Sequence, residues 1–149
     1  AYTASKPEAG FVYRDALWSG ADMLGVGVSS ISHLGGVNFQ NEHQFDPYVE
    51  RVESGELPVK RALELSNEER FIREFILQMK LGTNPLEQYR ERFGIDPASR
   101  YGRELEALET RGMLKVDEDA IRLDRGGLLQ VDGMLPDFYL ERHRDARYA

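Results

Sequence analysis

Residues 24–36, LGVGVSSISHLGG, change in character halfway along their length. In the first half Leu24, Val26 and Val28 alternate with glycine, which predicts a short strand over residues 22–28. The second half consists of small hydroxyl residues and a glycine pair, which predicts a loop. Glycine inside a strand marks close approach by another backbone or by a ligand. A single strand cannot form a sheet, so we expect either a short, unobvious partner or a sheet whose other strands lie elsewhere.

The loop is a candidate site for a small polar ligand. Its small residues are expected to leave peptide N–H and C=O groups open, and its serine hydroxyls can donate or accept hydrogen bonds. These residues are Gly27, Ser29, Ser30, Ser32 and Gly35. Open α/β sheets and barrels place their sites at the carboxyl ends of strands. The glycine order is not GxGxxG, so a dinucleotide is not indicated. The alternative is a strand packed tightly on a neighbour, followed by a plain loop.

The remainder of the chain is predicted to be mostly helical. The expected elements are a short helix and a turn over residues 44–60, helices over 66–82, 86–94 and 96–112, a hairpin over 113–123, and a last helix over 128–143 that Pro136 kinks or restarts. A capping box at residues 66–69 marks the start of the first long helix. This order is typical of a winged-helix-like domain. Its boundary with the preceding part is expected between about residues 41 and 62.

The composition excludes several classes of site. The chain has no cysteine, so it supplies neither a thiol nucleophile nor thiolate ligands for zinc or an iron–sulfur cluster. We find no signal-peptide pattern and no apolar run long enough for a membrane helix, and therefore expect a soluble, cytoplasmic protein with no membrane partner. The net charge of −7 argues against nucleic acid as a partner. The expected third helix carries mixed charges, and the expected hairpin carries several carboxylates, which phosphates would repel.

The sequence GADMLGVGVSSISHLGGVNFQN, residues 20–41, resembles the end of the catalytic domain in the oxygen-independent coproporphyrinogen III oxidase family of radical SAM enzymes. That family has a strand of pattern LGxGxSAxS followed by a loop that ends in a Gln-Asn pair, here Gln40 and Asn41. Residues 13–18 resemble the family's approach to this strand. Residues 105–132, LEALETRGMLKVDEDAIRLDRGGLLQVD, are similar to its C-terminal domain. The sequence departs from the family pattern at Ser30, where alanine is frequent, and at residues 124–127, where Thr-x-x-Gly is usual.

The resemblance implies an α+β fold: the last strand and loop of a partial TIM-like barrel in residues 1–43, then a mostly helical, winged-helix-like C-terminal domain in residues 44–149. The cluster-binding CxxxCxxC of the family is absent, so we expect a fragment of a longer protein. In the family the [4Fe–4S] cluster cleaves S-adenosylmethionine to a radical, which begins the oxidative decarboxylation of substrate propionates. The C-terminal domain would cover the barrel mouth.

The resemblance also assigns roles to individual residues. Ile31 matches a position that touches S-adenosylmethionine, and Gly25, Gly27, Ser29 and Ser30 would supply close backbone around that cofactor. Gln40 and Asn41 would line the side of the porphyrinogen substrate. No residue of this chain is expected to be catalytic. Two alternatives stay open at this point: a haem chaperone or haem-modifying relative of the same family, and a free-standing winged-helix binding module.

Overall fold

The computed structural model describes residues 10–144, so the first nine residues of the predicted first domain and the last five of the chain lie outside it. The chain divides into two compact units. One unit comprises residues 21–70, and the other combines the segment up to Gly20 with the segment from Phe71 onward. The predicted domains, 1–43 and 44–149, differ from these units and stay a prediction.

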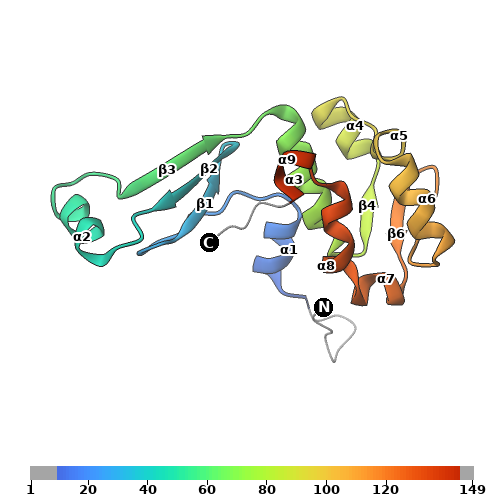
Figure 1. Cartoon of the computed structure of the whole chain (residues 1–149), viewed down its shortest axis with the longest axis horizontal. Coiled ribbons are helices and arrows are strands. Elements are labelled where there is room, and N and C mark those ends of the chain that lie inside the picture. The colour runs from blue at the N-terminus through green and yellow to red at the C-terminus, as the bar shows by residue number, and fades with distance from the viewer. Residues whose placement is uncertain (1–9, 145–149) are drawn as a thin grey trace. The chain divides into compact units, whose positions relative to one another are not determined.

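The unit of residues 21–70 contains a three-stranded antiparallel sheet with the order β1-β2-β3. Its elements are β1 (Ile31–Leu34), β2 (Val37–Asn41), α2 (Phe45–Glu53) and β3 (Val59–Glu64). Figure 1 shows the strands running side by side, with α2 in the connection from β2 to β3. The predicted short helix and turn over residues 44–60 are confirmed in outline, whereas β3 was not predicted.

The strand predicted over residues 22–28 is wrong. That segment makes one isolated bridge, between Met23 and His33, and the first strand begins only at Ile31. Gly27 has φ +107° and Ser29 has φ +62°, so the backbone turns where the apolar alternation suggested it would extend. The partners of β1 are also within the chain, because the Gly35-Gly36 pair closes a hairpin with β2.

The second unit is mainly helical, with a small antiparallel sheet of order β4-β6-β5. Its elements are α1 (Val12–Trp18), α3 (Asn67–Met79), β4 (Thr83–Pro85), α4 (Glu87–Phe93), α5 (Pro97–Arg100), α6 (Gly102–Thr110), β5 (Leu114–Val116), β6 (Ala120–Leu123), α7 (Arg125–Leu129), α8 (Val131–Met134), the 3-10 helix η1 (Leu135–Phe138) and α9 (Glu141–Arg144). Helix α3 begins within the first unit and continues into this one.

The predicted helices and hairpin are present in the predicted order. The capping box is confirmed, because Ser66 Oγ accepts from the Glu69 N–H (3.2 Å) and the Glu69 carboxylate accepts from the Ser66 N–H (2.9 Å). The helix predicted over residues 96–112 is divided into α5 and α6, and the one over 128–143 is divided into short pieces around Pro136. Strand β4 was not predicted. The winged-helix description itself stays a prediction.

The hydrophobic core of the described chain lies entirely between Phe71 and Phe138. At its centre the ring of Phe75 lies 5.2 Å from the rings of both Tyr101 and Phe138, measured between centroids. The Tyr101 hydroxyl donates to the Phe138 carbonyl (3.0 Å), so its polar atom is satisfied. Burial raises the pKa of the Tyr89 phenol, which donates to Gln78 Oε1. These contacts join α3, α4, η1 and Tyr101, which lies between α5 and α6, in one core.

Among the described glycines of this unit, Gly127 has the least room for a side chain. A Cβ added there would lie 1.9 Å from the carbonyl oxygen of Met113, so α7 can approach the start of the hairpin only because residue 127 is glycine. The Asp124 carboxylate accepts from the Gly127 N–H (2.6 Å) and holds this approach in place. Gly127, in the segment where the sequence departs from the family pattern, therefore has a packing role.

We predict that Gly127→Ala destabilises the chain by more than about 2 kcal/mol, because the new methyl group meets backbone, which cannot rotate away. Gly133→Ala is the matched control, since nothing lies within 4 Å of the added Cβ in helix α8. That control should be neutral or more stable by about 0.5 kcal/mol. Urea unfolding followed by circular dichroism measures both. Equal unfolding midpoints for the two variants would contradict the packing role.

The acidic turn of the β5–β6 hairpin is built around Asp117. Its Oδ1 accepts from the N–H groups of Ala120 (2.7 Å) and Asp119 (3.0 Å), and its Oδ2 accepts from Arg122 Nε (3.0 Å). The backbone donors, that of Ala120 first, lower the pKa of the Asp117 carboxyl below its ordinary value of 3.8. This acid therefore organises the turn.

A lowered pKa gives a pH dependence of definite sign. The ionised Asp117 stabilises the folded hairpin above about pH 4, and this contribution is lost as the pH falls through the lower folded-state pKa. We expect the urea midpoint of the parent chain to fall more steeply below pH 4 than that of Asp117→Asn. Asp119→Asn is the control and should keep the parent slope. Parallel slopes for all three chains would refute the assignment.

Candidate functional site

The loop before β1 is shaped by its own backbone. A Cβ added at Gly25 would lie 2.5 Å from the carbonyl oxygen of Ile31, which is closer than any side chain tolerates. Gly27 and Ser29 both have positive φ, a conformation that costs glycine little and serine more. The bare backbone of this stretch is thus required by contacts within the chain, and Gly25 needs no ligand to explain it.

Asn41 fastens this loop to the sheet. The Asn41 side-chain amide donates to the carbonyl oxygens of Gly27 (3.0 Å) and Gly25 (3.5 Å), and its backbone N–H donates to Ser30 O (3.0 Å). Only 6% of Asn41 is exposed. Because its side-chain N–H groups donate to carbonyl oxygens of the loop, Asn41 supports the loop in this structure. Its predicted contact with substrate stays a prediction.

Gln40 has a similar connecting role on the exposed side. Its Nε2 donates to the carbonyl of Ser29 (3.2 Å), and its Oε1 accepts from Nε of Arg61 (2.9 Å). Gln40 therefore joins the loop to strand β3 across the sheet. Arg61 was missed in the sequence, because nothing in the local pattern there indicated a strand adjacent to β2.

The serine hydroxyls are less available than the sequence suggested. Ser30 Oγ donates to Val26 O (2.8 Å), and Ser32 Oγ accepts from the Gly25 N–H (3.0 Å). The Gly35 N–H donates to Asp22 Oδ1 (3.1 Å). In this structure Ser30, Ser32 and Gly35 thus each use one polar group within the chain, and their predicted contact with a ligand stays a prediction.

Ile31 is the predicted cofactor contact that stays exposed. It is 59% exposed at the start of β1, although it is apolar. The strand register places it directly opposite Gln40, which in turn lies opposite Arg61. The structure thus brings the predicted residues together: Ile31 and Gln40 share one face of the sheet, and Gly27, Ser29 and Ser30 lie in the loop that Gln40 and Asn41 hold.

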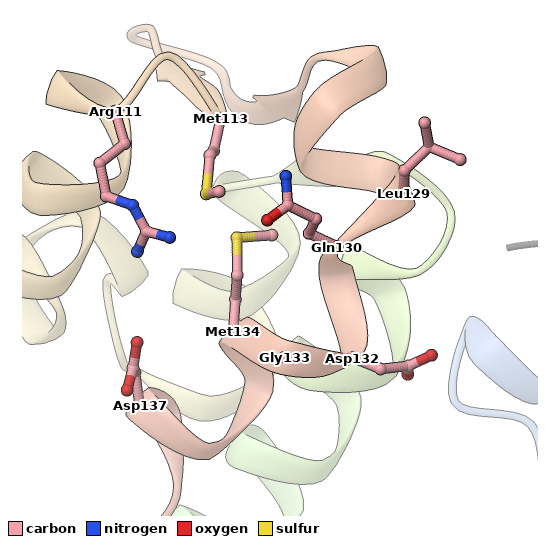
Figure 2. Close-up of a pocket in the computed structure, with 8 residues that line it drawn as sticks. All are labelled: Arg111, Met113, Leu129, Gln130, Asp132, Gly133, Met134 and Asp137. Atoms are coloured by element: carbon pink, nitrogen blue, oxygen red, sulfur yellow. The ribbon is translucent and has the colours of Figure 1, made fainter.

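The helical unit has a separate open pocket of about 310 Å³ (Figure 2). It is lined by Arg111, Met113, Leu129, Gln130, Asp132, Gly133, Met134 and Asp137. Figure 2 shows Met113 and Met134 at its centre, with Arg111 and Asp137 toward one side. None of the site residues predicted from the sequence lines this pocket.

Between residues 10 and 144, we find no group of histidine, aspartate or glutamate side chains arranged to hold a metal ion. Over the same residues, no helix has both the length and the apolar character needed to cross a membrane. The candidate site is the loop over residues 25–30 together with the face of β1–β3 that carries Ile31 and Gln40.

Comparison with known proteins first defines the class. Residues 65–129 match the model of the HemN C-terminal domain. The fold resembles that of a solved structure, coproporphyrinogen III oxidase (HemN) from Escherichia coli, described as a radical SAM enzyme. The TM-score is 0.65 at 24% sequence identity, over 78% of this chain and 28% of that one. This likeness supports the mixed α and β fold.

Two curated relatives are similar to most of this chain. The chain is 29% identical over 134 residues to the oxygen-independent coproporphyrinogen III oxidase of Pseudomonas aeruginosa, covering 86% of this chain and 29% of the relative. It is 31% identical over 122 residues to the enzyme of the same name from Helicobacter pylori strain 26695, covering 77% and 26%. Residues 65–129 therefore match the HemN C-terminal domain, and the chain is similar to oxygen-independent coproporphyrinogen III oxidases over most of its length, as the resemblance predicted. It spans less than a third of the length of these relatives.

The support that Asn41 gives to the loop can be tested by Asn41→Ala. Loss of the amide leaves the carbonyls of Gly25 and Gly27 without their donor, so we expect amide hydrogen exchange over residues 25–30 to become at least about tenfold faster. Asn38→Ala is the control, because Asn38 bonds the His33 ring (2.6 Å) and not the loop. Exchange that is equally fast in both variants, or unchanged in Asn41→Ala, would show that the loop does not depend on Asn41.

Proposed function

We propose that this chain is the C-terminal part of a longer radical SAM enzyme that acts on coproporphyrinogen III. The observation that carries the proposal is the similarity to oxygen-independent coproporphyrinogen III oxidases over 86% of the chain. The similarity includes both the loop with Ile31 and the HemN C-terminal domain. In this proposal the parent protein is a cytoplasmic oxidoreductase of haem biosynthesis, and this chain alone is inactive.

The two parts of the chain would have different tasks. Residues 1–43 would complete a barrel whose larger part precedes them, and residues 44–149 would cover its active site. The exposed apolar side chains of the sheet unit support a missing partner, since Ile31, Leu34 and Leu63 are each at least half exposed. A small sheet of this kind needs a further apolar surface to be stable, and the rest of the barrel would supply it.

The proposed cofactors differ in how well they fit these residues. The chain contains no cysteine, so the [4Fe–4S] cluster would be held entirely by the rest of the parent protein. The residues do fit one side of S-adenosylmethionine. Ile31 offers an exposed apolar surface, and Gly27 leaves open space where a side chain would otherwise stand, with only Ser30 Oγ within 4 Å of its added Cβ.

When bound, the cluster and S-adenosylmethionine would supply the radical chemistry of the reaction. The tasks of this chain are to bind, to orient and to exclude water. Gln40 and Asn41 hold the loop of Gly27, Ser29 and Ser30 in one shape through three side-chain hydrogen bonds to backbone carbonyls. A loop whose polar atoms are already satisfied does not reorganise when a ligand arrives, which reduces the entropic cost of binding.

The direct test uses the full-length gene product, reconstituted with iron and sulfide without oxygen and supplied with S-adenosylmethionine, a reductant and coproporphyrinogen III. We expect its intact mass to be well above the 17.0 kDa of these 149 residues, and we expect conversion of propionate to vinyl groups by mass spectrometry of the tetrapyrrole.

Two results would contradict the proposal. A native protein of about 17.0 kDa would leave no room for a cluster domain. A longer protein that leaves coproporphyrinogen unchanged but binds haem in a titration would instead favour a haem chaperone or haem-modifying relative, the alternative that the serine at position 30 leaves open.

A further inference from the structure

One face of the sheet β1–β3 carries an ordered row of three side chains. Ile31 on β1 pairs with Gln40 on β2, and Gln40 pairs with Arg61 on β3. Directly opposed residues of antiparallel strands lie on the same face with Cβ atoms roughly 5 Å apart. The predicted cofactor contact and a cation are therefore separated by the width of one strand.

The next row on the same face consists of His33, Asn38 and Leu63. No acidic residue occurs in either row, although the chain as a whole has a net charge of −7. Glu64 lies on the opposite face, since it pairs with Val37 and successive side chains of a strand alternate. Arg61 is thus a positive charge on a strand face whose two described rows carry no carboxylate.

The guanidinium group of Arg61 is only partly used. Its Nε donates to Gln40 Oε1 (2.9 Å), and within the part of the chain that the structure describes its two terminal nitrogens have no partner. The contact fixes the plane of the guanidinium and leaves its end free. Two parallel N–H groups at that end match the two oxygens of a carboxylate.

We propose that Arg61 binds a carboxylate of the ligand that lies against Ile31, and that Gln40 is a positioning residue that aims it. The inference rests on the proposed function, which supplies two ligands with carboxylates: the porphyrinogen, through its propionates, and S-adenosylmethionine, through its amino-acid end. Gln40 links the guanidinium to the Ser29 carbonyl, so the cation and the loop are held in one fixed relation.

The test measures binding to the full-length protein. The probes are coproporphyrin III, its tetramethyl ester and S-adenosylhomocysteine, each titrated by fluorescence or calorimetry. Variants are Arg61→Gln, Arg61→Lys and Gln40→Glu, the last of which places a carboxylate on the guanidinium and occupies it. The matched control is Lys60→Gln, which removes the same charge one residue away, from a side chain that contacts Glu42 (3.5 Å) and His43 (2.7 Å).

We expect Arg61→Gln and Gln40→Glu to weaken binding of one acidic probe by about tenfold or more, Arg61→Lys to weaken it less, and Lys60→Gln to have no effect. The tetramethyl ester should bind all variants equally. A loss for coproporphyrin III alone assigns the carboxylate to the substrate, and a loss for S-adenosylhomocysteine alone assigns it to the cofactor. If Arg61→Gln does not fold, Gln40→Glu and Arg61→Lys still give the answer.

Three results overturn the inference. In the first, Arg61 variants bind both acidic probes like the parent protein while the parent converts coproporphyrinogen; the proposed function then stands without this role. In the second, Lys60→Gln weakens binding as much as Arg61→Gln, so that only general charge matters. In the third, the parent protein neither binds the probes nor acts on coproporphyrinogen, and the proposed function fails with the inference.

Discussion

Every buried apolar side chain of the described core lies between Phe71 and Phe138, and this uneven distribution shapes the rest of the structure. The buried side chains of the sheet unit are polar: Ser32, His33 and Asn41. That unit is therefore held by hydrogen bonds, each of which stabilises it only modestly, while its apolar residues face outward. The exposed isoleucine and leucines fit the proposal that this unit packs against a further part of a longer protein.

The Asn41 side chain stabilises the loop before β1 by hydrogen bonds in the same way. The carbonyl oxygens of Gly25 and Gly27 lie at the buried Asn41 side chain, where acceptors without a donor would be costly. One primary amide donates to two of them, and the neighbouring Gln40 serves a third. The Gln-Asn pair thus explains why the loop can keep a left-handed serine, a conformation that must be stabilised by its surroundings.

The sequence allowed prediction of elements with strong local chemistry. The reciprocal cap at Ser66 and Glu69 marked the start of α3, and Gly94 with φ +68° ended α4 where expected. The prediction of a strand over residues 22–28 was wrong because alternating glycine and valine matches the period of a strand, while glycine also permits positive φ. Strand β3 was not predicted because most of its side chains are exposed. Its sequence therefore lacks the alternation of apolar and polar residues that identifies a half-buried strand. The role of Arg61 could not be predicted without that strand.

Arg61 shows how far the net charge of a chain can be used to infer its ligands. A net charge of −7 argues against a large anionic partner such as nucleic acid, whose many phosphates interact with charges over a wide area of the protein surface. A small ligand is different, because at physiological ionic strength charges beyond about 8 Å are screened. Within that range the face of Ile31, Gln40 and Arg61 presents a cation and, on its own strands, no acid. An acidic chain can therefore hold a local site for a carboxylate, provided that a neutral partner such as Gln40, and not a carboxylate, fixes the guanidinium.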